Sequence, residues 1–359
     1  MKTVLPVTQS FRWISETQQP FLIAGPCSAE TFEQLEGTAW ALTKLNVNLI
    51  RAGIWKPRTR PNSFEGVGEI GLEWIKEIQQ KTKIPFIIEV ANPRHVESAL
   101  KHNISHFWIG ARTTANPFAV QEIADSLKGT QTNILVKNPI NPDLALWIGA
   151  LERLNNANIT NLAACHRGFS FYGKSPFRNP PHWEIPLELR RQLPTLPLLC
   201  DPSHICGNTT LIKEIAQQSL DLGFNGLMIE THLNPQNALS DSHQQITPLE
   251  LKNLLNSLIF KHSDSQDDLY KRQLDNLRIQ IDELDDNLLE IIAKRMQIVK
   301  HIGLLKAENQ VQYFQFERYK ELLESRLVAG EKLNLSSEFT TRLLQLLHLE
   351  AIQEQAKNE

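Results

Sequence analysis

The sequence lacks any long hydrophobic run, and it has few cysteines and little excess charge. No stretch reaches about 18 consecutive apolar residues, so no membrane-spanning helix is expected. The 4 cysteines in 359 residues, with no signal peptide at the N-terminus, argue against a disulfide framework. The formal net charge of −3 argues against a general binder of nucleic acid or of membrane surfaces. We therefore expect a cytoplasmic protein that binds neither nucleic acid nor membrane.

Short apolar runs recur between residues 21 and about 260, separated by stretches with the composition of helices. In order they are FLIAGPCS, NLIRAG, PFIIEV, HFWIGAR, NILVKN, NLAACHRG, LPLLCDPSH and GLMIETH. Each run is almost continuously apolar and turns polar at its C-terminal end, which is typical of parallel strands buried on both faces. Eight such strand–helix units predict an α/β fold, an eight-stranded β/α (TIM) barrel. A doubly wound open sheet is the alternative.

The sequence after residue 260 is typical of helices alone. Apolar residues recur at spacings of three and four from Leu274 to Leu305, which predicts one helix of about 35 to 40 residues. Two shorter helices are expected near 316–329 and 336–357. No proline follows Pro248, which fits a region that is helical throughout.

The polar segment KHSDSQDD separates these two regions and has the composition of a linker. We therefore divide the chain into a barrel (1–262), a linker (263–269) and a small all-α domain of three helices (270–359). A long helix with a narrow apolar stripe needs a partner, so we expect the helical domain to form a homodimer.

Positive charges gather at the predicted strand ends. The segment NLIRAGIWKPRTRPN alone carries four cations in a loop stiffened by proline. Because the C-terminal ends of barrel strands meet at one mouth, these cations should converge there. Guanidinium and ammonium groups suit phosphates and carboxylates, so small substrates with several negative charges are expected. The residues concerned are Arg51, Lys56, Arg58 and Thr59 after the second strand, then Arg112, Lys137 and Arg167.

A different set of side chains ends the first and last strands. Cys27 follows strand one, His204 follows strand seven, Glu230 ends strand eight, and Asp241 lies just beyond. These strands become neighbours once a barrel closes, so the four groups should meet. Thiol, imidazole and carboxylate ligands together suit a first-row divalent metal that acts as a Lewis acid. The alternative is a buried cysteine among unrelated polar residues.

Taken in order, the strand-end motifs resemble those of a known enzyme family. AGPCS, RAG with KPRT, SFEGVGEIGL, IGAR, LVKNP, CHRG, DPSH and IETH with ALSD resemble 3-deoxy-D-arabino-heptulosonate 7-phosphate (DAHP) synthase of type Iβ. The resemblance covers about residues 10–260. It implies condensation of phosphoenolpyruvate with erythrose 4-phosphate and water, the first step of the shikimate pathway. KPRT favours this four-carbon aldose, and the alternative is an octulosonate or sialate type of synthase acting on a longer aldose.

The resemblance also implies a role for each strand-end residue. The implied metal ligands are Cys27, His204, Glu230 and Asp241, with manganese favoured over iron, cobalt or zinc. The implied phosphoenolpyruvate-binding residues are Arg51, Lys56, Arg112, Lys137 and Arg167. Arg58 and Thr59 are then expected to hold the phosphate of erythrose 4-phosphate. Lys56, near both reactants, is the candidate proton donor to the new alkoxide.

The helical region resembles the all-helical chorismate mutases, which convert chorismate to prephenate. The resemblance is carried by LRIQIDELDDNLLEIIAKR and the polar residues that follow it. The implied binding residues are Arg278 of the partner subunit, Arg295, Lys306, Arg318 and Gln355. Lys306 and Gln355 would stabilise the ether oxygen in the transition state. Tyr319 and Gln315 stand where the family commonly has acidic residues, so a non-catalytic regulatory and dimerisation module is the alternative.

The expected protein is thus a bifunctional transferase and isomerase. Only about 20 residues precede the first predicted strand, so no separate regulatory domain is expected before it. We therefore expect the mutase domain to be the sensor as well, with chorismate or prephenate as inhibitors of the barrel.

Overall fold

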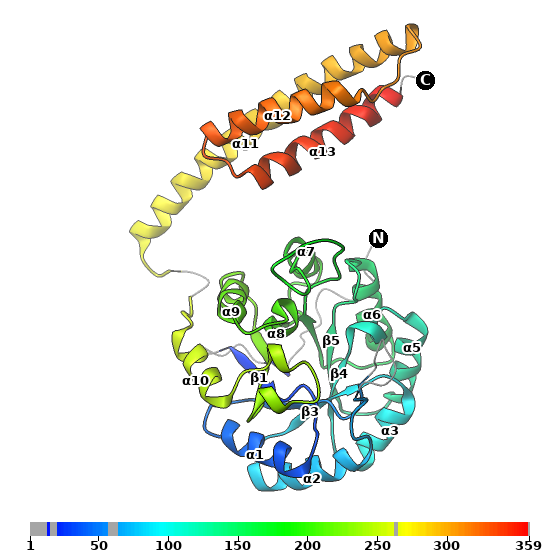
Figure 1. Cartoon of the computed structure of the whole chain (residues 1–359), viewed down its shortest axis with the longest axis vertical. Coiled ribbons are helices and arrows are strands. Elements are labelled where there is room, and N and C mark those ends of the chain that lie inside the picture. The colour runs from blue at the N-terminus through cyan, green and yellow to red at the C-terminus, as the bar shows by residue number, and fades with distance from the viewer. Residues whose placement is uncertain (1–12, 15–19, 57–63, 262–264, 358–359) are drawn as a thin grey trace. The chain divides into compact units, whose positions relative to one another are not determined.

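The computed structural model describes residues 13–14, 20–56, 64–261 and 265–357. The chain divides into two compact units, Met1–Ser263 and Asp264–Glu359, and each is described by itself. In the first unit, eight parallel strands form a closed barrel in the order β1 to β8 (Figure 1). The TIM-barrel prediction is therefore confirmed, and the open doubly wound sheet is excluded.

The strands coincide with the apolar runs of the sequence. They are β1 (Phe21–Gly25), β2 (Leu49–Ala52), β3 (Phe86–Val90), β4 (His106–Ile109), β5 (Asn133–Lys137), β6 (Leu162–His166), β7 (Leu198–Cys200) and β8 (Gly226–Glu230). The barrel closes where β1 pairs with β8, with Phe21 opposite Gly226 and Gly25 opposite Glu230. Gly25 has φ +145°, and a Cβ there would lie 2.3 Å from the carbonyl oxygen of Arg51. Glycine therefore lets β1 and β2 approach closely at their C-terminal ends.

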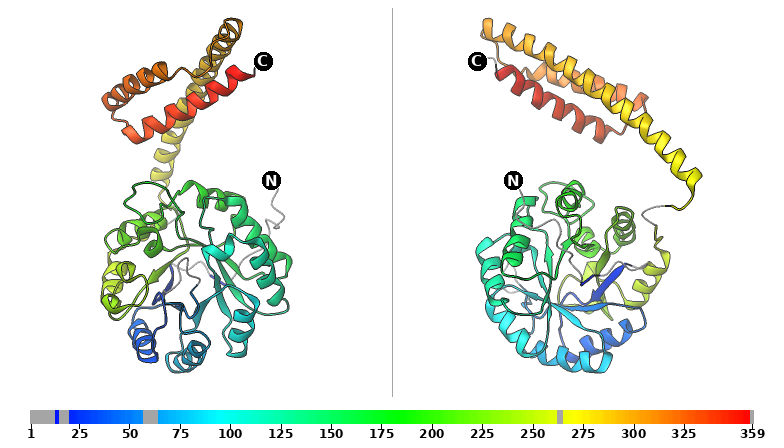
Figure 2. Two further views of the ribbon diagram at one scale, coloured as in Figure 1. Left: turned by 45° about the vertical axis from the view of Figure 1, so that its right-hand side comes forward. Right: turned by 180° about the vertical axis from the view of Figure 1, so that it is seen from behind.

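Helices surround the strands in both views of Figure 2. They are α1 (Phe32–Leu42), α2 (Ile70–Thr82), α3 (Pro93–Lys101), α4 (Ala111–Thr114), α5 (Pro117–Ser126), α6 (Leu144–Asn156), α7 (Glu184–Gln192), α8 (Pro202–Cys206), α9 (Ile212–Asp221) and α10 (Pro248–Ser257). Two short 3-10 helices, η1 (Pro235–Asn237) and η2 (Ser242–Gln244), follow β8. Local sequence explains several helix starts: Thr247 and Glu250, for example, form a capping box around Pro248 at the start of α10.

Two hydrophobic cores hold the barrel together. The larger core lies between the strands and the helices, and the smaller one contains residues such as Ile23, Ile87 and Trp108 that point into the barrel. Ile14 also belongs to the inner core, and the Trp13 ring packs edge-on against Phe21 with centroids 5.7 Å apart. The N-terminal ends of the strands are therefore covered by the chain itself, whereas polar side chains gather at the opposite ends.

The second unit is helical, with α11 (Asp268–Glu308), α12 (Phe316–Lys332) and α13 (Ser337–Ala356). The predicted long helix and the two shorter ones are confirmed. Asp267 caps α11 by accepting hydrogen bonds from the backbone of Leu269 and Tyr270, so the predicted linker 263–269 overlaps the start of this helix. Among the described helices, none combines the length and the apolar character needed to cross a membrane.

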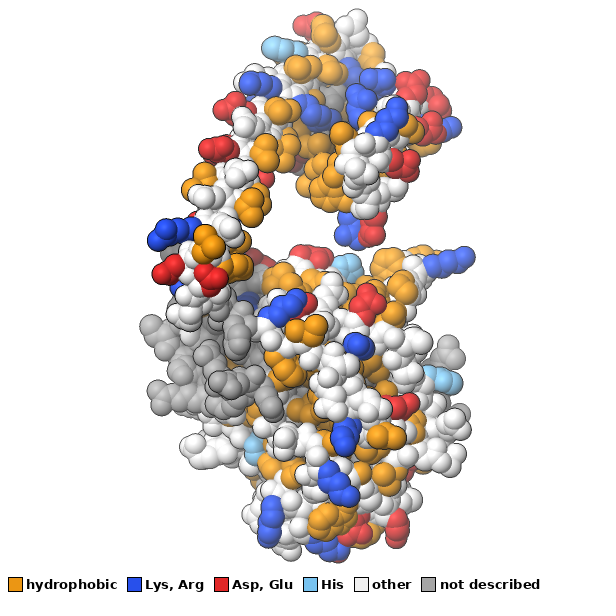
Figure 3. Space-filling model, turned by 90° about the vertical axis from the view of Figure 1, so that its left-hand side faces the viewer, with side chains coloured by type: hydrophobic (Ala, Val, Ile, Leu, Met, Phe, Trp, Pro, Cys, Tyr) orange, Lys and Arg blue, Asp and Glu red, His pale blue; other side chains and the backbone are white. Residues whose placement is uncertain are grey.

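Apolar side chains of α11 remain on the surface of the single chain. Figure 3 shows hydrophobic side chains gathered on the surface of the helical unit. We call the following residues the α11 stripe: Leu277, Ile281, Leu284 and Leu288, which are 49 to 67% exposed. Such an exposed apolar stripe is unusual on the surface of a monomeric protein.

Candidate functional site

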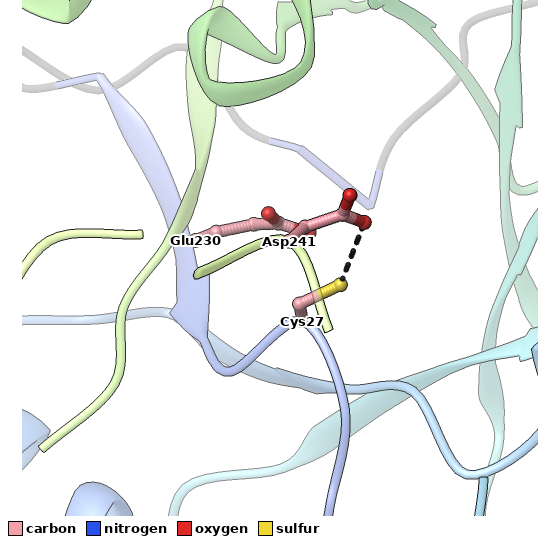
Figure 4. Close-up of side chains that lie close together, drawn as sticks. All are labelled: Cys27, Glu230 and Asp241. Atoms are coloured by element: carbon pink, nitrogen blue, oxygen red, sulfur yellow. Dashed lines mark hydrogen bonds between the residues drawn. The ribbon is translucent and has the colours of Figure 1, made fainter. Parts of the chain in front are cut away.

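Three side chains able to bind a metal meet at the C-terminal ends of the strands. The ligand atoms of Cys27, Glu230 and Asp241 all lie within 4.8 Å of one another (Figure 4). Cys27 follows β1, Glu230 ends β8, and Asp241 precedes η2, so the pairing of β1 with β8 brings them together. The Cys27 Sγ lies 3.3 Å from the Asp241 Oδ2.

His204, the fourth predicted ligand, lies at the edge of this group. It belongs to α8, and its Nε2 is 3.8 Å from the Glu230 Oε1, but it is not within 4.8 Å of all three others. Its Nδ1 lies 2.8 Å from the Oδ2 of Asp201, a fully buried carboxylate. Asp201 also caps α8 by accepting a hydrogen bond from the backbone nitrogen of His204. Asp201 therefore holds one ring nitrogen and leaves the other on the side of Glu230.

Burial holds Cys27 as a neutral thiol in the absence of a cation. Burial raises the pKa of the Cys27 thiol to about 12, and the carboxylate of Glu230 adds to this shift. The Lys56 Nζ lies 2.9 Å from the Cys27 Sγ and 2.7 Å from the Cys27 carbonyl oxygen. A divalent ion would bind the thiolate and displace the thiol proton. A thiolate, an imidazole and two carboxylates fit a first-row divalent metal better than magnesium or calcium, which prefer oxygen ligands.

Both carboxylates of the group are ionised at neutral pH. Burial alone would raise the pKa of Glu230, but Arg51 and His204 hold it below its usual range. Burial likewise opposes ionisation of Asp241, and His204 and Arg178 hold the pKa of that carboxyl well below its usual range. The site therefore presents two negative charges to a cation.

Two of the predicted phosphoenolpyruvate-binding cations lie in the same buried network. Arg51, only 1% exposed, places its Nη2 2.9 Å from the Glu230 Oε1. The Lys137 Nζ lies 2.7 Å from the Asp201 Oδ2. Both cations also lie over the Trp108 ring, at 5.1 Å and 5.6 Å from its centroid. The Trp108 ring thus contacts the charged groups of both Arg51 and Lys137.

The other predicted cations lie nearer the surface of the mouth. Burial lowers the pKa of Arg167 to about 10 against the attraction of Asp201, and the nearby charges of Arg178 and Arg112 lower it further. Arg167 still keeps its charge at neutral pH, and Arg112 is exposed on α4. The charges of Arg112 and Arg178 act on Arg167, and such a group of three guanidinium side chains attracts anions. Arg58 and Thr59 lie outside the described residues.

In the helical unit, the predicted residues fall into two groups. Arg295 donates to the carbonyl of Leu347 (3.1 Å), and Lys306 donates to that of Tyr313 (2.7 Å). Burial lowers the pKa of Lys306. Gln355 is buried on α13, where its Nε2 donates to its own helix. By contrast, the exposed side chains Arg278 and Arg318 pair with acidic residues of their own helices, Asp275 and Glu321.

His348 is a further polar residue of this unit that the sequence did not single out. Burial lowers the pKa of His348, and the charges of Arg295 and Lys306 lower it further, so the three side chains lie near one another. The ring of Tyr319 packs on His348 with centroids 4.4 Å apart. Tyr319, one of the two residues that depart from the family pattern, is thus part of the same cluster.

Known protein families match both units. The model of the DAHP synthetase I family matches residues 6–266, and the model of chorismate mutase type II matches residues 277–356. The chain therefore belongs to the DAHP synthetase I family, and it carries a chorismate mutase type II domain. Enzymes of the DAHP synthase family are generally metal-dependent, which agrees with the donor set at the barrel mouth.

Individual relatives agree with this assignment. A phospho-2-dehydro-3-deoxyheptonate aldolase of Thermotoga maritima is 31% identical over 225 residues, which cover 63% of this chain and 64% of the relative. A 2-dehydro-3-deoxyphosphooctonate aldolase of Helicobacter acinonychis is 26% identical over 284 residues, covering 68% and 97%. A bifunctional chorismate mutase/prephenate dehydratase of Buchnera aphidicola is 36% identical over 87 residues, covering 24% and 23%. The chain thus spans a little under two thirds of the Thermotoga relative.

Solved structures resemble the barrel. The crystal structure of the Thermotoga maritima aldolase (DAHP synthase) superimposes with a TM-score of 0.60 at 28% identity, covering 67% of this chain and 68% of that one. A truncated form of 3-deoxy-D-arabino-heptulosonate 7-phosphate synthase from the same organism gives 0.58 at 26% identity, covering 67% and 85%.

Proposed function

We propose that the chain is a bifunctional cytoplasmic enzyme. The barrel (1–262) condenses phosphoenolpyruvate with erythrose 4-phosphate and water to give DAHP and phosphate. The helical domain (270–359), joined by the linker 263–269, rearranges chorismate to prephenate. The observation that carries the first activity is the meeting of Cys27, Glu230 and Asp241 beside buried cations at the mouth of the barrel.

The residues that hold the metal in this proposal are Cys27, His204, Glu230 and Asp241. Mn²⁺ is the proposed ion, and Fe²⁺, Co²⁺ and Zn²⁺ suit the same donors. When bound, the ion supplies Lewis-acid polarisation of the aldehyde carbonyl. The charge of Arg51 keeps Glu230 ionised, burial opposes protonation of His204, and Asp201 lies against its Nδ1 so that the Nε2 is left for the ion.

The cations of the mouth bind and orient phosphoenolpyruvate. Its phosphate and carboxylate are held by Arg51, Lys56, Arg112, Lys137 and Arg167. Arg58 and Thr59 hold the phosphate of erythrose 4-phosphate, an assignment that rests on the sequence. The carbon–carbon bond forms when the enol carbon attacks the aldehyde; water then adds to the resulting cationic carbon, and the phosphate leaves. Lys56, whose ammonium lies beside Cys27, donates a proton to the new alkoxide.

The mutase reaction needs only electrostatic stabilisation. Arg295 and Arg318, with Arg278 of the partner subunit, hold the two carboxylates of chorismate. Lys306 and Gln355 stabilise the ether oxygen as charge develops on it. The exposed α11 stripe supports a homodimer through this unit, because a second copy would cover these side chains and bring its own Arg278 alongside.

The helical unit is also the proposed sensor of the pathway product. Chorismate or prephenate, bound at the mutase site, inhibits the barrel by changing how the two units associate. Synthase rates measured with increasing prephenate test this proposal. Binding of prephenate that leaves the rate and the KM values of the synthase unchanged would contradict it.

Two direct assays on the full chain test the main proposal. With Mn²⁺ present, we expect DAHP from phosphoenolpyruvate and erythrose 4-phosphate, and much slower product formation when arabinose 5-phosphate replaces the four-carbon aldose. In parallel, we expect chorismate to disappear and prephenate to form. Preference for arabinose 5-phosphate would assign the barrel to the octulosonate type. Stable chorismate would make the helical unit a regulatory and dimerisation module.

A further inference from the structure

Gln244 connects the two carboxylates of the proposed metal site, although it has no ligand role there. It ends η2 and is only 1% exposed. Its Nε2 donates a hydrogen bond of 2.6 Å to the Glu230 Oε2. Its Oε1 accepts one of 2.9 Å from the Nη1 of Arg178, which also donates to the Asp241 Oδ1 at 2.9 Å. A continuous chain of hydrogen bonds therefore runs from Glu230 to Asp241.

These hydrogen bonds each occupy one oxygen of the two carboxylates. Gln244 takes the Oε2 of Glu230, and Arg178 takes the Oδ1 of Asp241. The Oδ2 of Asp241 is the oxygen that lies beside the Cys27 Sγ. The orientation of both carboxylates thus depends on an amide that donates at one end and accepts at the other.

The neighbouring glutamine supports the same site from the other side. The Oε1 of Gln245 accepts a hydrogen bond of 2.9 Å from the backbone nitrogen of Cys27. Its Nε2 donates to the carbonyl of Ser240, the residue before Asp241, at 2.8 Å. The pair Gln244–Gln245 therefore contacts Cys27, Glu230 and the segment that carries Asp241.

Because Gln244 is buried, it fixes the geometry of these hydrogen bonds more firmly than Arg178 does. Arg178 is 50% exposed, and an ion pair with that much solvent access holds its geometry weakly by itself. Gln244 is buried, so its hydrogen bonds compete with little water and fix the guanidinium as well as Glu230. Losing the amide would free Arg178 and leave the Glu230 Oε2 without this donor.

We propose that Gln244 is a positioning residue that pre-orients Glu230 and, through Arg178, Asp241 for a divalent cation. The inference rests on the proposed function, since it presupposes that these side chains hold the metal. Residues that orient metal ligands commonly change metal affinity by about 10- to 100-fold when they are replaced. The apolar residue closest in size, methionine, removes both hydrogen bonds with little change in volume.

The test is a Mn²⁺ titration of the metal-free full chain, with free Mn²⁺ followed by electron paramagnetic resonance. We expect Gln244→Met to weaken Mn²⁺ binding by about 10-fold or more. Gln244→Asn keeps an amide but is one methylene too short to span both partners, so it should weaken binding in the same direction. Saturating Mn²⁺ should restore most of the synthase activity of both variants. An unfolded protein would not respond in this way.

The matched control is Gln79→Met, at the opposite end of the barrel, where Gln79 accepts a hydrogen bond from the Phe86 backbone nitrogen (2.6 Å). It should bind Mn²⁺ like the unmodified chain. Cys27→Ala tests the proposed metal site separately, because it removes the ligand atom altogether. If Cys27→Ala binds Mn²⁺ normally, the proposed metal site itself is wrong. If Cys27→Ala loses binding while both Gln244 variants keep the unmodified affinity, only the role of Gln244 is overturned.

Discussion

Asp201 shows how one carboxylate organises several functional groups of the barrel. It lies against His204 and Lys137 at 2.8 Å and 2.7 Å, and Arg51 lies 3.9 Å away. Asp201 also precedes Pro202 and caps α8, an arrangement typical of a helix start. Its contact with Lys137, by contrast, joins a strand 64 positions earlier in the sequence.

Asp201→Asn is expected to damage both activity and stability. The amide keeps the volume but removes the charge that compensates Lys137 and orients His204. We expect the free energy of unfolding to fall by about 3 kcal/mol, since a buried cation loses its partner. Synthase kcat should fall about 10-fold or more. Urea unfolding and steady-state kinetics measure the two effects.

The control for this variant is Asp221→Asn, which removes a surface ion pair with Lys261. It should change stability by less than about 1 kcal/mol and leave the kinetics unaltered. Equal effects of the two substitutions would mean that Asp201 has no special role.

His106 should make the barrel less stable in mild acid. Burial lowers the pKa of His106 from 6.5 to about 4, and Asn133 lies 2.9 Å from its Nε2. Between these two values the unfolded chain binds the proton and the folded chain does not, so stability falls as the pH is lowered from 6.5 to 4. His106→Gln should reduce the slope of unfolding free energy against pH by about 1 kcal/mol per pH unit. Urea unfolding at a series of pH values measures the slope, and equal slopes for both proteins would contradict this interpretation.

At the scale of single elements, the α11 stripe is the feature with the clearest consequence. Leu284→Asp places a charge in the surface that the homodimer would bury, so the dimer should dissociate at micromolar concentration. Mutase activity should fall with it, because the proposed contribution of Arg278 of the partner subunit would be lost, while synthase activity remains. Sedimentation velocity and the two assays follow these changes. Asp286→Asn, a polar exchange elsewhere on α11, serves as the control; a dimeric Leu284→Asp protein would exclude the stripe as the interface.

The elements themselves were largely predictable from the sequence. Each barrel strand coincides with an almost continuously apolar run, and α11 has a clear period of three and four residues, so both signals are local. The short helices α4 and α8 were not predicted, because four or five residues contain too little periodicity. The candidate ligands could be proposed because strand ends meet in a barrel. The hydrogen bonds of Gln244 could not, because they depend on side-chain packing between loops.

At the scale of the whole molecule, the proposed activities of the two units use different chemistry. The proposed synthase site needs a cation, whereas the proposed mutase site uses only arginine, lysine and glutamine side chains. Dialysis against a chelator should therefore abolish DAHP formation and leave the chorismate mutase rate within about twofold, because electrostatic stabilisation by these groups needs no ion. Adding Mn²⁺ back should restore the first rate. A parallel loss of mutase activity would show that the units depend on each other or that the ion has a structural role in both.

The seam between β1 and β8 gives the proposed ion a mechanical role as well. These strands lie at opposite ends of the barrel sequence, and Cys27 stands on one side of the seam with Glu230 on the other. An ion bound by both residues would stabilise the closed barrel, because separating β1 from β8 would require the ion to be released. Loss of the ion would then ease the parting of the first and last strands, and heat would inactivate the barrel sooner.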